Sequence, residues 1–241
     1  CMGARRLYLS CGFVIEEGFP MEQLEQIAAA MEKTAKEAGV RIVAGDTKVA
    51  GKGQVDGVFI TTTGVGQMEE GVHMAGDQAR PGDVVIATGD VGRHGCTILL
   101  SREDFGIEAE VTSDCAPLWS AVKAMLDVTH RVHVTRDATR GGVGTVLYEI
   151  AGQSKVGIRL DARAVPVAPE VRGVCGLLGL EPLYLACEGR LVIVAPEEEA
   201  WGILDALHSC PDCAGACVIG RVTEEQPGRV IMDTEIGGQA I

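Results

Sequence analysis

Residues 135–143, which read TRDATRGGV after an apolar run, contain the residue types of a phosphate-binding site. Backbone amides at the start of a helix bind anions, and paired glycines let the main chain approach a ligand closely. An arginine can pair with two phosphate oxygens, and an aspartate can hold a bridging magnesium ion. The candidate phosphate ligands are Asp137, Thr139, Arg140, Gly141 and Gly142. The alternative is that Asp137 only caps the helix and the glycines only tighten the turn.

A second candidate site lies at residues 45–48, which read GDTK. A short buried strand is predicted at 40–44, so that Asp46 and Lys48 stand where this strand ends. An acid and a base two residues apart at such a point suit a metal, a phosphate or a substrate group. A surface turn with a solvated ion pair is the alternative.

Two single residues are candidates for proton transfer. Glu188 follows an apolar run and precedes a glycine, where partial burial would suit it to general-base work. The alternative is an ordinary glutamate in a turn. His94 lies in residues 89–95, which read GDVGRHG and match neither the dinucleotide nor the Walker A phosphate loop. The alternative for His94 is a structural or solvated histidine.

Four soft ligands gather near the C-terminus with the spacing H-x-C-x2-C-x3-C. These residues are His208, Cys210, Cys213 and Cys217. They could hold a zinc ion, but typical zinc sites pair two knuckles across a longer loop, and this compact set would strain to close. An incidental or redox-sensitive cysteine loop is the favoured alternative. Most of the nine cysteines stand singly in apolar contexts and resemble reduced core residues.

Composition limits the classes of protein to consider. The 241 residues are 46% hydrophobic, enough for one large domain or two modest ones. The 32 glycines and 4% aromatic content suit an α/β or α+β enzyme with many tight turns. A net charge of −13 repels polyanions, so nucleic-acid binding is disfavoured. No apolar run reaches membrane-spanning length and no signal-peptide core is visible at the start, so we predict a cytoplasmic protein.

The N-terminal part of the chain predicts a small sheet covered by one amphipathic helix. Its expected elements are a strand at 7–15, a helix from 21 to 38 ended by Gly39, and strands at 40–44 and 55–65. The polar segment 67–82 is the candidate boundary, which gives domains of residues 1–76 and 77–241.

The C-terminal part predicts a layered sheet. The expected strands are 84–88, 131–135, 157–160, 183–186 and 191–195, followed by a closing hairpin of 218–222 and 229–232. The expected helices are 118–126, a segment ending near Ala151, 169–178 and 197–207. Ser113 and Asp114 supply an N-terminal signature for the first of these helices. Because several strands are adjacent in sequence, an α+β fold is favoured over a doubly wound sheet.

Six short motifs together resemble the HypE family of hydrogenase maturation factors, over essentially the whole chain. They are LSCGF at 9–13, EEG at 16–18, GDTKV at 45–49, RDATRGGV at 136–143, RGVC at 172–175 and EGRLV at 188–192. This family belongs to the superfamily of aminoimidazole ribonucleotide synthetase and selenophosphate synthetase. The resemblance implies two α+β domains, an N-terminal domain whose strands pair across a homodimer, and ATP bound between domains and subunits.

The resemblance also implies a reaction. A carbamoyl group on a C-terminal cysteine thiol would be dehydrated with ATP to a thiocyanate, whose cyanide goes to the iron of nickel–iron hydrogenase. Asp46 and Asp137 would contact Mg²⁺ and phosphates, and Arg140 and His94 would line the phosphate region. Lys48 and Glu188 would handle protons. The implied partners are the carbamoyltransferase HypF and the HypC–HypD iron scaffold complex.

The sequence departs from the family pattern at both ends. The glycine-rich N-terminal segment, the acidic stretch before Cys1 and the tail with the terminal cysteine are absent, so we expect an inactive fragment of a longer protein. Two alternatives stay open. One is another ATP-dependent enzyme of the superfamily, such as selenophosphate synthetase, and the other is a non-catalytic assembly module.

Overall fold

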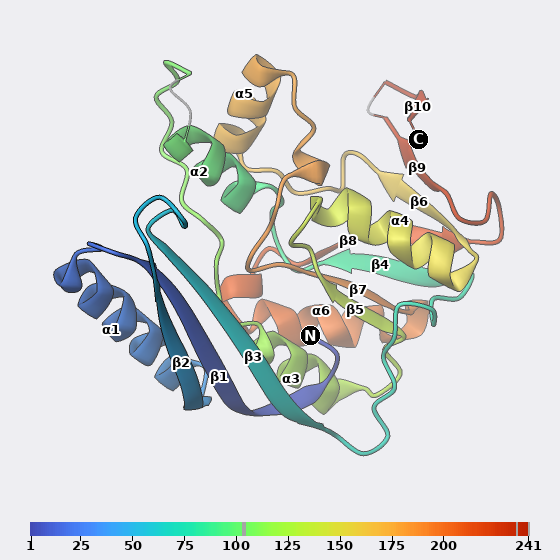
Figure 1. The fold of residues 1–241 in the computed structure, drawn as a ribbon. Coiled ribbons are helices and arrows are strands. Elements are labelled where there is room, and N and C mark those ends of the chain that lie inside the picture. The colour runs from blue at the N-terminus through green and yellow to red at the C-terminus, as the bar shows by residue number, and fades with distance from the viewer. Residues whose placement is uncertain (103–104, 235, 241) are drawn as a thin grey trace. The chain divides into compact units, whose positions relative to one another are not determined.

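The computed structural model describes residues 1–102, 105–234 and 236–240 (Figure 1). Contacts divide the chain into two compact units, of which one is Ala4–Glu70. The other joins Cys1–Gly3 to Gly71–Ile241. The change of unit after Glu70 lies inside the segment 67–82, and the domain limits of 1–76 and 77–241 stay a prediction. No helix in the described part of the chain combines the length and the apolar character needed to cross a membrane.

The Ala4–Glu70 unit is a three-stranded sheet with one helix. Its elements are β1 (Ala4–Glu16), α1 (Met21–Glu37), β2 (Arg41–Ala50) and β3 (Val58–Met68), with sheet order β2-β1-β3. β1 pairs parallel with β2 through the α1 crossover and antiparallel with β3. Gly39 has φ +63°, the left-handed conformation expected of the residue that ends α1.

The strands of this unit are longer than the sequence predicted. β2 continues to Ala50, so residues 45–48 lie within a strand and the prediction of a strand end there was wrong. Hydrogen bonding to β1 extends as far as the pair Glu16 and Ala50, which keeps the chain extended past Gly45. A side chain at Gly45 would lie 2.7 Å from the carbonyl oxygen of Cys11, so this glycine permits the close approach of β1 and β2.

The larger unit contains a seven-stranded mixed sheet. In sheet order its strands are β10 (Gln239–Ala240), β9 (Val230–Asp233), β6 (Gly157–Asp161), β8 (Cys217–Thr223), β4 (Asp83–Ala87), β7 (Leu191–Pro196) and β5 (Val134–Asp137). All neighbours pair antiparallel except β6 and β9. β4 and β7 are buried along their whole length, as expected for strands covered on both faces.

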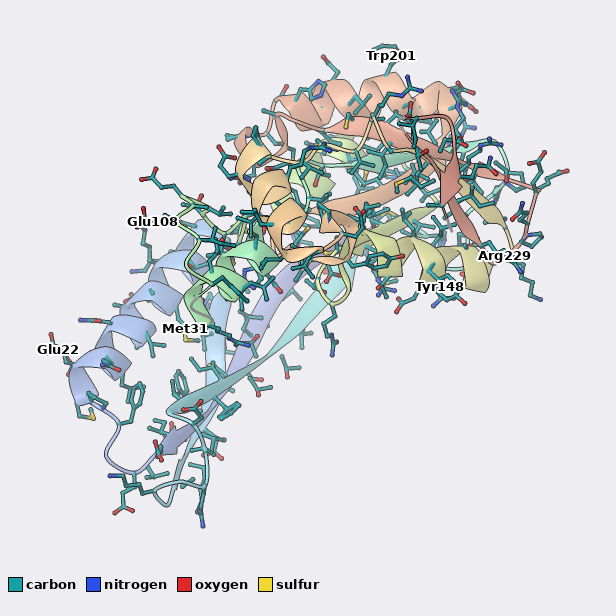
Figure 2. The ribbon with its side chains drawn as sticks, turned by 90° about the horizontal axis from the view of Figure 1, so that it is seen from above. Glu22, Met31, Glu108, Tyr148, Trp201 and Arg229 are labelled. Carbon is teal, nitrogen blue, oxygen red and sulfur yellow. The ribbon has the colours of Figure 1, made fainter. Side chains whose placement is uncertain are left out.

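Helices cover both faces of this sheet (Figure 1). The helices of the unit are α2 (Arg93–Arg102), α3 (Trp119–Val128), α4 (Gly142–Ser154), α5 (Pro169–Leu178) and α6 (Ala200–His208). Val85 in β4 packs with α4, whereas its neighbour Ile86 packs with α3 and α6 on the opposite face. On α6, Ile203 is buried and Trp201 projects outward (Figure 2).

Three predictions for this unit were wrong. Residues 183–186 form no strand, because Pro182–Tyr184 is a 3₁₀ turn. The segments 218–222 and 229–232 form no hairpin, since β6 lies between β8 and β9 and pairs with both. α3 begins after Leu118 without a side-chain cap. The carboxyl of Asp114, the expected cap, instead accepts a hydrogen bond from the backbone of Glu188.

Candidate functional site

The candidate phosphate ligands begin where β5 ends. Asp137 is the last residue of β5 and lies opposite Leu191 of β7. Two backbone hydrogen bonds extend this pairing, from Ala138 N to Arg190 O (3.1 Å) and from Cys187 N to Ala138 O (2.9 Å). The register therefore brings the Asp137 turn beside residues 187–190, which include Glu188. Sequence reasoning found the two motifs separately, and the strand pairing joins them.

The turn between β5 and α4 depends on its two glycines. Gly141 and Gly142 have φ values of +73° and +60°, a conformation that favours glycine. A side chain on Gly142 would lie 2.4 Å from the carbonyl oxygen of Leu183. This close approach fixes the start of α4 against the 3₁₀ turn.

The start of α4 has no side-chain cap, and Gly142 and Val143 at this start are buried. The Asp137 carboxylate accepts a hydrogen bond from Thr139 Oγ1 (2.9 Å). The alternative that Asp137 is a helix cap is therefore not supported. Arg140 is exposed and has no salt-bridge partner in the described part of the chain. A helix start without a side-chain cap and an exposed guanidinium suit a phosphate group.

Glu188 lies half-buried in a tight turn beside residues 137–142, which we call the α4 cradle. Its backbone N–H donates to Asp114 Oδ1 at 3.2 Å. A side chain on the following Gly189 would lie 1.7 Å from the carbonyl oxygen of Asp114, so only glycine fits there. Burial raises the pKa of the Cys115 thiol, and the negative charges of Glu188 and Asp114 raise it further. The side chain of Cys115 therefore lies near both carboxylates.

Arg190 connects this turn to neighbouring loops. Its guanidinium donates to Asp90 Oδ1 (2.7 Å), to Asp90 O (3.0 Å) and to Asp212 O (3.0 Å). Asp90 also pairs with Arg93. Sequence reasoning missed the roles of Asp90 and Arg190. The available signals were the position of Asp90 just after the buried strand β4 and that of Arg190 beside Glu188.

His94 lies in the first turn of α2 and faces the same loop segment. Its Nδ1 forms a hydrogen bond with Ser113 Oγ (2.9 Å), and that oxygen also accepts the backbone N–H of Cys115 (3.1 Å). Residues 113–115 thus contact both His94 and Glu188. Hydrogen bonds of Ser113 and Asp114 therefore connect His94 to the Glu188 turn, and backbone pairing connects that turn to the Asp137 turn.

Asp46 and Lys48 belong to the Ala4–Glu70 unit. They are two residues apart on β2, so their side chains share one face of the strand, and both are exposed. Asp46 Oδ1 accepts the backbone N–H of Thr47 (2.9 Å). The solvated ion pair considered from the sequence is not among the salt bridges of the described residues.

The four soft ligands near the C-terminus point to different partners. His208 Nε2 bonds to Ala216 O (2.8 Å), Cys210 Sγ contacts Ala206 O (3.7 Å) and Cys217 Sγ contacts Ala164 O (3.4 Å). Within the described residues, no three His, Cys, Asp or Glu side chains form a group that could hold a metal. The structure thus offers no support for zinc here, because the side chains do not converge.

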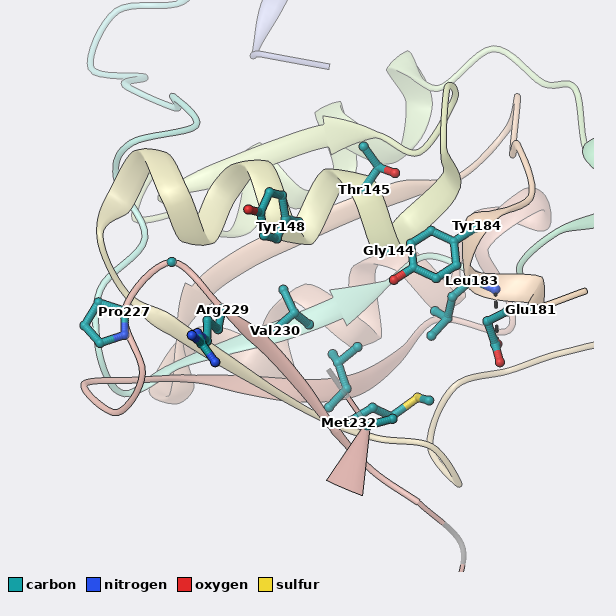
Figure 3. Close-up of a pocket in the computed structure, with 13 residues that line it drawn as sticks. Gly144, Thr145, Tyr148, Glu181, Leu183, Tyr184, Pro227, Arg229, Val230 and Met232 are labelled. Carbon is teal, nitrogen blue, oxygen red and sulfur yellow. Dashed lines mark hydrogen bonds between the residues drawn. The ribbon is translucent and has the colours of Figure 1, made fainter. Parts of the chain in front are cut away.

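A cavity of about 710 Å³ lies along α4, with Gly144 and Thr145 of the first turn of the helix in its lining (Figure 3). Tyr148, Tyr184 and Arg229 stand around it, and its floor is apolar with Leu183 and Met232. Among the described residues that line it, none is a candidate phosphate ligand, although Thr145 and Leu183 lie next to Gly141 and Gly142.

Comparison with known proteins agrees with the geometry of both units. Residues 1–68 match the family described as AIR synthase related protein, N-terminal domain, and residues 80–233 match its C-terminal domain. Carbamoyl dehydratase HypE of Azotobacter vinelandii is 48% identical over 236 residues, which cover 98% of this chain and 69% of that protein.

Solved structures give the same result. HypE in complex with ATP aligns with a TM-score of 0.95 at 46% identity, covering 99% of this chain and 73% of that one. The HypE–HypF complex aligns with a TM-score of 0.96 at 40% identity, covering 100% of this chain and 78% of that one. The chain therefore belongs to the HypE family of AIR-synthase-related proteins.

Proposed function

We propose that this chain performs the carbamoyl dehydratase reaction in the maturation of nickel–iron hydrogenase. ATP drives the dehydration of a thiocarboxamide on a C-terminal cysteine to a thiocyanate, which supplies the cyanide ligand of the active-site iron. The observation that carries this proposal is 48% identity to a carbamoyl dehydratase over 98% of the chain. Backbone hydrogen bonds also hold the Asp137 turn beside the Glu188 turn, and this proximity supports a reaction that needs both a phosphate site and a proton acceptor.

The reaction needs a leaving group that an amide lacks. Transfer of the ATP γ-phosphoryl group to the amide oxygen converts that oxygen into phosphate, whose departure leaves the carbon–nitrogen triple bond. Two protons must leave the nitrogen during this sequence. The protein has to position phosphates and accept protons, which electrostatic and geometric complementarity can achieve.

The α4 cradle binds phosphate in this proposal. Amides of its uncapped N-terminus and the exposed Arg140 guanidinium neutralise phosphoryl oxygens. Asp137 is a carboxylate that would hold Mg²⁺, and Asp46 has the same proposed role by its motif match. Mg²⁺ is bound through one or two carboxylates with phosphate oxygens, and Asp137 Oδ2 accepts a hydrogen bond from Thr139 Oγ1. When bound, the ion neutralises charge on the phosphates.

Glu188 and Lys48 handle the protons of the amide nitrogen. The backbone N–H of Glu188 donates to Asp114, so the main chain from which the Glu188 side chain projects is held in place. His94 lines the phosphate region in this proposal and is oriented by Ser113. Catalytic roles for these three residues rest on their matching motifs and on the contacts described above.

Three partners follow from the proposal. A carbamoyltransferase of the HypF type loads the cysteine, and the similar solved structure of a HypE–HypF complex supports it. A HypC–HypD scaffold receives the cyanide. A second copy of the chain covers the Ala4–Glu70 sheet, whose apolar side chains are exposed, among them Val43, Val49, Phe59 and Val65.

Release of inorganic phosphate from ATP tests the proposal. With the full-length protein, HypF and carbamoyl phosphate, we expect phosphate release from ATP only after the protein has been carbamoylated. Glu188→Gln and Lys48→Met should abolish it, while Asp127→Asn on the exposed face of α3 leaves it unchanged. Phosphate release that ignores carbamoylation would contradict the proposed reaction and favour another ATP-dependent member of the superfamily.

A further inference from the structure

One buried carboxylate in the larger unit is incompletely hydrogen-bonded. The side chain of Asp114 is fully shielded from solvent. Among the described residues, its Oδ2 is the buried side-chain polar atom that lacks a hydrogen-bond partner. An unsatisfied buried polar group costs about 1–3 kcal/mol, and more when charged, so its retention needs an explanation.

The other oxygen of this carboxylate holds the turn that carries Glu188. Asp114 Oδ1 accepts the Glu188 backbone N–H at 3.2 Å. The carbonyl oxygen of Asp114 occupies the space that a side chain on Gly189 would need, at 1.7 Å. Asp114 therefore contacts two successive residues of the turn and determines where the Glu188 main chain lies.

The nearby cation balances the charge of Asp114 without bonding to it. Arg190 Nε lies 3.9 Å from Asp114 Oδ2, beyond hydrogen-bonding distance. The guanidinium is committed elsewhere, to the side chain and carbonyl of Asp90 and to the carbonyl of Asp212. The Asp114 carboxylate thus keeps its hydrogen bond to Glu188 while Arg190 offsets its charge.

The same segment also contacts His94. Ser113 Oγ binds His94 Nδ1 and the backbone N–H of Cys115. Residues 113–115 therefore contact both His94 and Glu188. Asp114 is the buried member of these three residues.

We propose that Asp114 is a positioning residue for the dehydration, because its buried carboxylate holds the Glu188 main chain and so directs the Glu188 side chain toward the substrate. Asp114 does not touch the substrate itself. This inference rests on the proposed role of Glu188 as a proton acceptor.

Turnover and ATP affinity of variants of the full-length protein test this role. We expect Asp114→Ala to lower kcat by about 10- to 100-fold, since a small displacement of a reactive group has effects of that size. The Kd for ATP should stay within about twofold, because the pairing of β5 with β7 and the contact of Gly142 with Leu183 O hold the α4 cradle in place. Asp114→Asn should recover most of kcat, since its amide oxygen can still accept the Glu188 N–H. Asp127→Ala is the matched control at an exposed aspartate.

A second acceptor-free variant, Asp114→Leu, fills the same space and serves if Asp114→Ala does not fold. The proposal fails if the acceptor-free variant turns over like the wild type, if Asp114→Asn is as slow as that variant, or if ATP affinity falls in parallel with kcat. Glu188→Gln is measured beside them. Wild-type turnover in Glu188→Gln would overturn the role of Glu188, whereas an inactive Glu188→Gln with an active Asp114→Leu would overturn the role of Asp114 alone.

Discussion

At the scale of single residues, the proposed chemistry depends on side chains that are not needed to pack the core. Asp137 does not cap α4, Arg140 has no salt-bridge partner in the described part of the chain, and the start of α4 has no side-chain cap. A charged group without a structural partner is available for a ligand. By contrast, the Arg190 guanidinium donates to the Asp90 carboxylate and to the carbonyl oxygen of Asp212, and Asp90 also pairs with Arg93, so these residues act as scaffold for the turns.

Replacement of Asp137 tests the phosphate and magnesium assignment. Asp137→Asn keeps the size of the side chain but removes the charge that would attract Mg²⁺, so we expect ATP affinity to fall about 10- to 100-fold. Isothermal titration with ATP and Mg²⁺ measures this change. Asp161→Asn, at an exposed aspartate paired with Arg163, is the control. Unchanged affinity in Asp137→Asn would remove Asp137 from the site.

The Cys187 thiol makes stability depend on alkaline pH. Burial raises its pKa to about 12, although the backbone N–H of Gly92 and the charge of Arg190 act in the opposite direction. Below about pH 9 the thiol is protonated in the folded and unfolded chain alike, and its contribution to stability is complete. Between about pH 9 and 12 only the unfolded chain loses the proton, so the free energy of unfolding falls as pH rises.

Cys187→Ala should make this decline shallower by about 1 kcal/mol per pH unit. Urea unfolding of both proteins between pH 8 and about 10.5 measures the difference. Burial also raises the pKa of Cys213, to about 11, so part of the decline remains in the variant. Equal slopes in the two proteins would show that Cys187 is not the source.

At the element scale, the site depends on chain segments that approach one another without intervening side chains. Gly142 lies against the carbonyl of Leu183, Gly189 against that of Asp114, and Gly95 near the backbone of Ala186. These contacts bring the start of α4, the Glu188 turn and the start of α2 together. Larger residues at these positions would push the turns apart.

The Gly142 turn offers a matched pair of substitutions in one helix. Gly142→Ala should destabilise the protein by at least about 2 kcal/mol, because alanine there has φ +60° and clashes with Leu183 O. A side chain on Gly152, in the same helix, meets no atom within 4 Å, so Gly152→Ala should be neutral or stabilising by up to about 1 kcal/mol. Denaturant unfolding compares them, and similar effects of the two variants would contradict this account.

The local sequence pattern predicted many helices and strands, but it could not predict which strands, distant in sequence, pair with each other. The apolar runs gave β4 and β7, and the helix at 169–178 was confirmed with the same bounds. The hairpin was wrong because hydrophobic pattern identifies strands but not their partners, and β6 inserts between β8 and β9.

The candidate site shows the same limit. The motif types predicted which residues suit phosphate chemistry, and the register of β5 and β7 was needed to place Asp137 near the Glu188 turn. From the sequence, Asp114 was interpreted as a helix cap because its neighbouring residues are typical of a helix start. A contact 74 residues away takes its carboxylate instead, which no local pattern contains.

At the scale of the whole molecule, the Ala4–Glu70 unit buries little apolar surface. None of the α1 residues is buried, and the buried hydrophobic residues of this unit's described part are Cys11, Ile15 and Val40. Exposed Val49, Phe59 and Val65 add a large apolar area to its sheet. A sheet of this kind is expected to be covered by a partner, and the proposed homodimer would provide one.

Light scattering with size-exclusion chromatography tests the proposed homodimer. We expect the full-length protein to have the mass of a dimer. Phe59→Glu should shift it toward the monomer at micromolar concentration, because a charge would be buried in the interface. Leu177→Glu on α5, at an apolar side chain that is more exposed than Phe59, should leave the dimer intact. A dimer unaffected by Phe59→Glu would exclude this part of the sheet from the interface.

The dehydration of a carbamoylated cysteine by this protein can be followed on a single peptide. The intact mass of the C-terminal peptide of the full-length protein is measured after incubation with HypF, carbamoyl phosphate and ATP. We expect the gain of one carbamoyl group, followed by an ATP-dependent loss of one water that Glu188→Gln prevents. A carbamoylated peptide that keeps its water in the presence of ATP would show that the protein does not carry out this dehydration.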